Sequence, residues 1–224
     1  MTTAIATIVY PSLAMFEKLW PHGDQHIAGL VEGIVAAAPR VFPKYGFAST
    51  TAVAMALAQF SEECGAGLEM MENFDYTAER LREVFPTHFT SISMALHYAH
   101  NPRAAADIAY GGRMGNAKPP SDDGYNFRGA GLSQVTGRDG VAAAQKVLDA
   151  HKAGFSILTD PALIIDPEHT LECGVADFVA CGCLPYAEKN DMIKVTEHLN
   201  GGLIGLADRR AWLPKWRLEL GIPR

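Results

Sequence analysis

The feature that most constrains the fold is a succession of short helical patterns, each closed by proline or glycine. In residues 27–41 the apolar side chains share one helical face, at Ile27, Leu30, Val31, Ile34 and Val35. Residues 52–64 are apolar on nearly every side, which predicts a central helix that Gly65 and Gly67 would end. The sequence therefore predicts a mainly helical domain built from short elements.

The remaining segments fit the same picture. Further helices are predicted at residues 12–20, 78–85, 91–100, 102–110, 141–150, 168–181, 191–199 and 207–220. Pro214 is predicted to kink or split the last of them. Residues 111–131 are rich in glycine and proline and should form a loop, with a short strand at 132–136. We expect one domain, with two helical lobes around a cleft and at most a small β element.

Composition excludes several classes of protein. Hydrophobic residues make up 48% of the 224 residues and charged residues 20%, which is incompatible with a wholly disordered chain. The net charge of −6 argues against a general nucleic-acid-binding protein, which would carry a basic excess. No apolar run is long enough to predict a membrane span. Four cysteines are too few for a disulfide scaffold, so we expect free thiols.

Two glutamates, Glu63 and Glu72, are the candidates for acid–base chemistry. On one continuous helix their nine-residue spacing corresponds to a turn of about 900°, so the side chains would point to opposite sides. Gly65 and Gly67 allow the chain to leave the helix after Glu63 and to bring Glu72 back. Glu63 would then be desolvated and protonated at the end of an apolar helix, whereas Glu72 would stay ionised in a polar loop. The alternative is that both are ordinary surface glutamates.

The segment 110–138 combines aromatic and polar side chains in a glycine-rich loop, among them Tyr125, Phe127, Gln134 and Thr136. Sugars need apolar surface for their ring faces and hydrogen bonds for their hydroxyls, so this mixture indicates carbohydrate binding. A turn-rich connection without a ligand is the alternative. A phosphate-binding loop is not expected, because the pattern G-x-x-x-x-G-K-[ST] is absent.

Several ordered motifs across residues 50–212 together resemble glycoside hydrolase family 19, which contains chitinases and phage endolysins. A-Q-F-S-E-E-C-G, which contains Glu63, resembles the family's A-Q-x-x-H-E-S-G. E-N-F-D-Y-T-A-E-R-L, which begins at Glu72, resembles E-N-L-N-Y-S-x-x-x-L. N-P-R-A-A-A-D-I-A-Y-G-G-R-M-G-N and D-G-Y-N-F-R-G-A-G-L-S-Q-V-T-G-R are similar to its central signature, and L-N-G-G is similar to I-N-G-G.

The resemblance implies a lysozyme-like, two-lobed fold and a role for each matching residue. Glu63 would be the general acid, Glu72 the general base, and Thr136 the hydroxyl that helps to hold the attacking water. Substrate would be bound by Gln134, Asn200, Tyr125 and Arg209, of which Arg209 would also support the carboxylates. No metal or organic cofactor is implied.

Four positions depart from the family pattern, and they bear on substrate preference more than on the reaction. Glu62 and Cys64 stand where the family has histidine and serine. Ala130 and Ser133 replace the arginine and isoleucine of G-R-G-L-I-Q. Glu62 is either a third carboxylate acting on Glu63 or a solvated bystander, and Cys64 is expected to be a buried thiol rather than a nucleophile.

We expect inverting hydrolysis of β-1,4 bonds next to an N-acetylated amino sugar. Peptidoglycan of the bacterial cell wall is the expected substrate, as for a phage endolysin with lysozyme activity. Chitin is the alternative, and a non-catalytic glycan-binding protein is the second alternative. No basic residue precedes Lys18, so we expect synthesis in the host cytoplasm without a cleavable signal peptide and action on the wall after release. The protein is expected to be a monomer that binds no nucleic acid.

We expect a single catalytic domain with three parts: an N-terminal helical segment (1–49), the catalytic core (50–212) and a basic helix end (213–224). Basic residues from Arg209 to Arg224 could rest on an anionic wall. A solvated basic face, with Trp212 and Trp216 packed inward, is the favoured interpretation. His22 and His26 have the spacing of a helical metal pair but no evident third ligand, so they are expected to be surface histidines.

Overall fold

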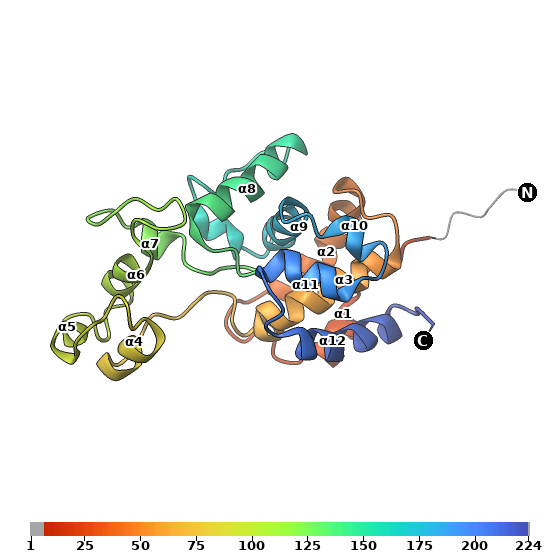
Figure 1. Ribbon diagram of the computed structural model, residues 1–224. Helices are drawn as coiled ribbons and strands as arrows, with labels where there is room; N and C mark the ends of the chain where they lie inside the picture. The colour runs from red at the N-terminus through yellow and green to blue at the C-terminus, as the bar shows by residue number, and fades with distance from the viewer. Residues whose placement is uncertain (1–6, 224) are drawn as a thin grey trace, which may run out of the picture.

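The computed structural model describes residues 7–223 and consists almost entirely of helices (Figure 1). They are α1 (Leu13–Leu19), α2 (Leu30–Lys44), α3 (Thr50–Glu63), α4 (Ala78–Val84), α5 (Ile92–Leu96), α6 (Pro102–Tyr110), α7 (Asp123–Asn126), α8 (Gly137–Ala150), α9 (Thr170–Ala180), α10 (Leu184–Ala187), α11 (Met192–Asn200) and α12 (Leu206–Glu219), with short 3-10 turns η1 (Gly65–Gly67) and η2 (Pro161–Ile164). The predicted mainly helical fold is confirmed. Residues 1–6 of the N-terminal segment and Arg224 of the basic stretch lie outside the described residues.

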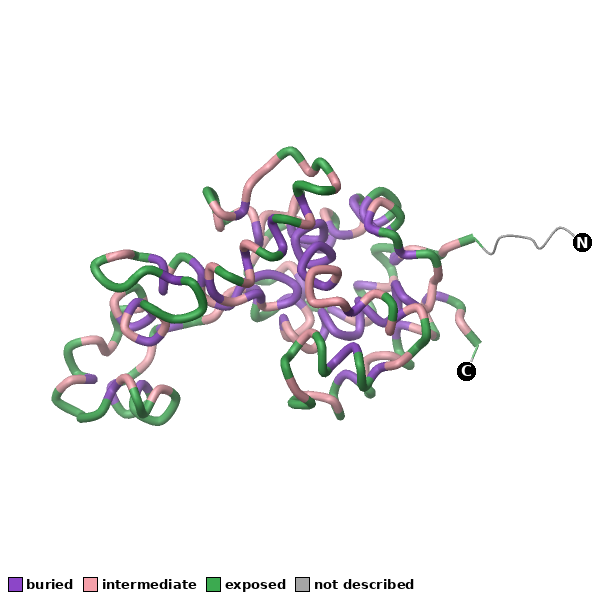
Figure 2. Tube along the Cα trace, turned by 45° about the horizontal axis from the view of Figure 1, so that its top comes forward, coloured by how far each residue is buried: buried purple, intermediate pink, exposed green. Residues whose placement is uncertain are grey.

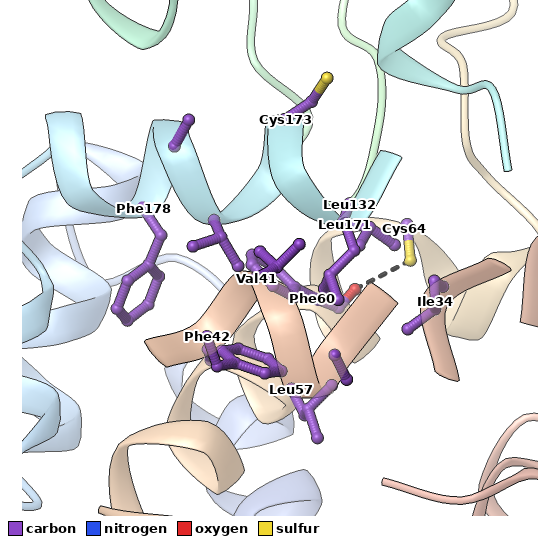
Figure 3. Close-up of a cluster of buried hydrophobic side chains, with 14 of the residues drawn as sticks. Ile34, Val41, Phe42, Leu57, Phe60, Cys64, Leu132, Leu171, Cys173 and Phe178 are labelled. Carbon is purple, nitrogen blue, oxygen red and sulfur yellow. Dashed lines mark hydrogen bonds between the residues drawn. The ribbon is translucent and has the colours of Figure 1, made fainter. Parts of the chain in front are cut away.

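The larger lobe is organised around α3. The Ser49 side chain caps this helix by accepting a hydrogen bond from the backbone N–H of Ala52, and nearly every residue from there to Ser61 is buried. Helices α2, α9 and α12 pack around it, and Figure 3 shows Phe42 of α2, Phe60 of α3 and Phe178 of α9 in the resulting core. The apolar sequence of α3 thus places the end of this helix, where Glu63 stands, against a rigid support.

The smaller lobe contains α4 to α7 and extends to the left of the larger one in Figure 1. Its core is a separate and much smaller cluster, formed by Phe74, Ala78, Leu81, Phe89, Ala95, Ala105, Ala106 and Ala109. Five of these eight residues are alanines, so this core buries few large apolar side chains. Figure 2 shows the same contrast, with buried chain concentrated in the larger lobe and mostly exposed chain at the tip of the smaller one.

The chain crosses between the lobes twice, and backbone hydrogen bonds join the two crossings. Met71 and Ala130 form an antiparallel bridge, and Ala130 also bridges to Val135. The N–H of Glu72 donates to the carbonyl of Gly129 at 2.8 Å. A short strand was predicted at residues 132–136, but these residues turn back over Ala130 instead of extending. The described residues contain only these isolated bridges in place of the predicted β element. Glu72 therefore lies where the lobes meet.

Several helix boundaries differ from the sequence-based prediction. Helix α12 continues through Pro214, because Trp216 beyond it is buried against Phe16 and Trp20 in the larger lobe. Helix α2 likewise runs on to Lys44, and the short helices α7 and α10 lie in segments where no helix was predicted. In each case tertiary packing outweighs local sequence preference. No helix within residues 7–223 is long and apolar enough to cross a membrane.

Candidate active site

Glu63 is the last residue of α3, as predicted, and the chain turns away immediately after it. Gly65 and Gly67 have positive φ angles of 53° and 91°, which residues with side chains rarely adopt. A Cβ atom on Gly67 would also lie 2.8 Å from the carbonyl oxygen of Gly23, so only glycine permits this close approach. The glycine break thus leads the chain from Glu63 toward Glu72.

The surroundings of Glu63 differ from the apolar, unpaired environment that the sequence suggested. Its Oε1 atom accepts a hydrogen bond from Nη2 of Arg209 at 2.6 Å, and the side chain of Arg209 is only 3% exposed. That arginine comes from α12, 146 residues along the chain, and its contact with Glu63 agrees with the supporting role that the family resemblance implied. Glu63 is thus partly buried, as predicted, and a buried guanidinium compensates its carboxylate, which the argument from burial alone did not include.

A buried polar chain fixes Arg209 in turn. Nη1 donates to Oε1 of Gln59 at 2.7 Å, and the amide of Gln59 donates to the hydroxyl of Thr196 in α11 at 3.3 Å. Gln59 precedes Glu63 by one helical turn, so both project from the same side of α3. Three helices of the larger lobe thus hold the carboxylate of Glu63 in one orientation.

Glu72 is half-buried, whereas the sequence predicted an ionised glutamate in a polar loop. The hydroxyl of Tyr110 donates to its carboxylate at 2.9 and 3.0 Å, and the backbone N–H of Gly129 donates at 3.2 Å. Burial raises the pKa of Glu72, while the bonds from Tyr110 and Gly129 and the charge of Arg128 oppose that rise. The expectation of a solvated Glu72 is thus corrected, because α6 folds Tyr110 over the carboxyl group.

Three oxygen atoms converge above the Cα atom of Gly129. A Cβ atom built there would lie 3.1 Å from Oε1 of Gln134, 3.2 Å from Oγ1 of Thr136 and 3.5 Å from Oε2 of Glu72. The NH₂ group of Gln134 is committed to the carbonyls of Glu69 and Gly131, which leaves its oxygen atom on the Gly129 side. A side chain at position 129 would crowd these three acceptors, so glycine allows them to face one another.

Two pockets have Gln134 in common, and we refer to them together as the groove. The first, of about 280 Å³, is lined by Glu63, Ser133, Gln134, Val135, Thr136, Gly140, Asp177, Cys181, Leu199 and Asn200. The second, of about 600 Å³, is lined by Leu68, Glu69, Met71, Glu72, Asn73, Tyr76, Arg80 and Gln134. The structure therefore brings together five of the predicted site residues, with Glu63 in one half of the groove and Glu72 in the other.

Tyr125 and Arg209 are placed differently. Tyr125 lines a further pocket, which has Met71 in common with the Glu72 half of the groove, and the guanidinium of Arg128 lies 3.9 Å from the centre of its ring. That face of the ring is therefore unavailable for stacking on a sugar. Arg209 lies behind Glu63 and lines neither half of the groove, so it contacts the carboxylate rather than the groove itself.

Several site residues were not predicted from the sequence, namely Gln59, Tyr110, Gly129 and Asp177. The one-turn spacing of Gln59 and Glu63 was a usable signal, since it places both side chains on one helical face. The other three come close to the glutamates only through the crossings and the packing of α9, which no local pattern encodes. Glu62 is half-buried against Gly205, where burial raises its pKa, and it lines neither half of the groove.

The cysteines and histidines are accounted for by their surroundings. The thiol of Cys64 is buried in the core, donates to the carbonyl of Phe60 and has its pKa raised to about 12 by burial, so it is a packing residue (Figure 3). His22 and His26 are exposed. Within residues 7–223 no group of three or more histidine, cysteine and acidic side chains is arranged to hold a metal ion.

No family model matches this chain, but one relative is similar to it in sequence over most of its length. A protein of Haemophilus influenzae (strain ATCC 51907 / DSM 11121 / KW20 / Rd), described as a glycosyl hydrolase family 19 domain-containing protein, is 32% identical over 198 residues. The matched part comprises 87% of this chain and 89% of that protein.

Solved structures share the fold at low sequence identity. A mutant of chitinase C matches with a TM-score of 0.61 at 15% identity, over 97% of this chain and 96% of that one. A bacterial family 19 chitinase matches with a TM-score of 0.55 at 20% identity, over 95% of both chains. Chitinase C from Streptomyces griseus HUT6037 matches with a TM-score of 0.54 at 16% identity, over 95% of this chain and 78% of that one.

Proposed function

The chain belongs to glycosyl hydrolase family 19 and is a glycoside hydrolase, and on that premise we propose that it cuts β-1,4 bonds of bacterial peptidoglycan as an endolysin. One observation carries the proposal: Glu63 and Glu72 lie in adjoining halves of one groove, with Gln134 common to both. Two carboxyl groups on either side of a bound polysaccharide are what hydrolysis of a glycosidic bond requires.

In the proposed mechanism the glycosidic C–O bond breaks while water attacks from the opposite face. Glu63 gives its proton to the leaving oxygen, and Glu72 takes a proton from the water, whose oxygen bonds to the anomeric carbon. Such inverting pairs have carboxyl groups about 6.5–9.5 Å apart, which leaves room for the water. Thr136 and Glu72 would hold that water in the space above Gly129, and the anomeric configuration of the product would invert.

The partners of the two glutamates support these roles. Arg209 contacts Oε1 of Glu63 and stabilises the carboxylate that remains once the proton has left. Burial raises the pKa of Glu72, which strengthens it as a base as long as the pH keeps it ionised. Gln134 and Asn200 supply amide groups of the kind that bind N-acetylated sugars.

Chitin is the second candidate substrate, because two chitinases of known structure share the fold over 95% of this chain. Both polymers contain β-1,4-linked N-acetylglucosamine, so the groove chemistry described above suits either. We further propose that the protein acts as a monomer on the wall after release from the cytoplasm.

Parallel digestion of purified peptidoglycan and colloidal chitin tests the proposal. We expect soluble fragments from peptidoglycan, with mass spectrometry of the reducing ends identifying the cleaved bond, and an inverted anomer in the first NMR spectra. Glu63→Gln and Glu72→Gln should each lower turnover at least about 100-fold while the thermal unfolding midpoint stays close to that of the wild type. Hydrolysis of chitin alone would identify chitin, and not peptidoglycan, as the substrate. Glycan binding without turnover would contradict the proposed hydrolysis.

A further inference from the structure

Asp177 is a buried carboxyl group in the Glu63 half of the groove that neither the sequence patterns nor the proposed mechanism uses. It lies in the last turn of α9, is 6% exposed, and lines the same pocket as Glu63, Thr136 and Asn200. Its side chain accepts a weak hydrogen bond from the thiol of Cys181, whose sulfur lies 3.9 Å from Oδ1, and the side chain of Ser133 lies close by.

Among residues 7–223, two of the three other buried acids are paired with cations, and the third, Asp107, accepts a hydrogen bond from the backbone N–H of Tyr125. Glu172 on the same helix binds both Arg40 and Lys44, and Asp123 has a guanidinium nitrogen 2.7 Å away. No Lys, Arg or His side chain among the described residues forms an ion pair with Asp177. A buried carboxyl group without a cation is costly for the folded protein, and such groups concentrate where a ligand completes their hydrogen bonding.

We propose, on the basis of the function proposed above, that Asp177 is a sugar-binding residue that accepts hydrogen bonds from hydroxyl or N–H groups of an N-acetylglucosamine unit in the Glu63 half of the groove. Ser133, Gln134, Thr136 and Asn200 surround it with neutral polar groups. A sugar ring in this pocket would bring several donors to a carboxylate that has few of its own.

The charge of the pocket sets its selectivity. Glu63 and Asp177 both line it, and no Lys, Arg or His does. A sugar unit with a free carboxylate, such as muramic acid with an unsubstituted lactyl group, would be repelled by the ionised carboxylate of Asp177. It also could not donate a hydrogen bond there, because a carboxylate only accepts hydrogen bonds. The pocket therefore favours a neutral N-acetylglucosamine unit over a muramic acid unit whose lactyl carboxylate is free.

Ionisation of Asp177 links this binding to pH. Burial and the charge of Glu63 on α3 raise the pKa of Asp177 to about 6, and the contacts from Ser133 and Cys181 oppose the rise. The carboxylate needed to accept hydrogen bonds forms as the pH rises through that value. The dissociation constant for a neutral oligosaccharide should therefore decrease as the pH rises from about 5 to about 7.5.

Calorimetric binding of N-acetylglucosamine oligosaccharides to the Glu72→Gln protein isolates this contact, since hydrolysis is blocked. Adding Asp177→Asn should raise the dissociation constant about tenfold at pH 7.5 and remove its pH dependence, because a hydrogen bond to a charged acceptor is lost. Glu168→Gln, which neutralises an exposed acid just before α9, should leave the dissociation constant unchanged. An oligosaccharide with a free lactyl carboxylate should bind more weakly than the neutral one, and Asp177→Asn should narrow that difference.

A folded Asp177→Asn protein with an unchanged dissociation constant would overturn the assignment. If that variant does not fold, a pH-independent dissociation constant in the Glu72→Gln protein alone would overturn it as well. The proposed function fails separately, when the wild-type protein hydrolyses neither polymer. In that case oligosaccharide binding that still depends on Asp177 would leave the assignment of this residue intact.

Discussion

The two glutamates stand in regions of very different construction. Glu63 belongs to the larger lobe, where a buried guanidinium and an extensive apolar core hold it. Glu72 lies on a crossing between lobes, beside a small cluster rich in alanine, and is held by one phenol and one backbone N–H. The comparison teaches that the proposed acid is fixed by charge and dense packing, whereas the proposed base is tuned by burial in a region of low local stability.

Arg209→Ala tests the ion pair that holds Glu63, and it should have the largest effect on the unfolding free energy. Removing the guanidinium leaves Glu63 partly buried without its cation and leaves the acceptor of Gln59 unpaired. Breaking a buried ion pair in this way costs about 3 kcal/mol of unfolding free energy, and turnover should fall with it. Denaturant unfolding and initial rates measure both.

Arg210→Ala serves as the matched control, because Arg210 is the exposed neighbour on the same helix. It should change the unfolding free energy by less than about 0.5 kcal/mol. Equal destabilisation by the two substitutions would mean that the larger lobe does not depend on the charge pair.

Gly129→Ala tests the space beside Glu72. The added methyl group would lie between the carboxylate, Gln134 and Thr136, where the attacking water is proposed to sit. Turnover should fall about 100-fold, since a water displaced by roughly 1 Å is no longer aligned for attack. Oligosaccharide affinity in the Glu63 half of the groove and the thermal midpoint should change little. Retained turnover would place the water elsewhere.

Tyr110→Phe tests how Glu72 is tuned. The hydroxyl of Tyr110 donates to the carboxylate and so lowers the pKa of Glu72 against the effect of burial. Without it the pKa rises further, so the base becomes protonated at higher pH. The acid limb of the kcat/KM profile should therefore move up by about one pH unit or less.

Tyr98→Phe removes a phenol from the same lobe, where its ring packs on Phe89 away from Glu72, and should leave that limb in place. If the acid limb of the kcat/KM profile also stays in place in the Tyr110→Phe protein, a group other than Glu72 sets that limb.

The sequence predicted the helical architecture well and the environments of the site residues poorly. Helix α3, its end at Glu63 and the glycine break depend on local spacing, so the pattern of residues was sufficient. The partner of Glu63 comes from α12, and the phenol over Glu72 comes from α6, so both environments depend on long-range packing. The sequence analysis consequently missed that Glu72, which it placed in a polar loop, is half-buried as well. Asp177 escaped notice for the same reason, since only the folded groove shows that it lacks a cation.

A matched pair of core substitutions, Phe60→Leu and Phe89→Leu, should have the smallest effects and bears most directly on the two lobes. Both rings are fully buried, Phe60 against Phe178 in the larger lobe and Phe89 against Phe85 and Tyr98 in the smaller one. Each change should cost about 1 kcal/mol. Hydrogen exchange should locate the loss: over the whole chain for Phe60→Leu, but only in residues 74–110 for Phe89→Leu, because a weak lobe can open by itself. Global loss from both would mean that the crossings couple the lobes into one cooperative unit, and the proposed base would then be held as firmly as the acid.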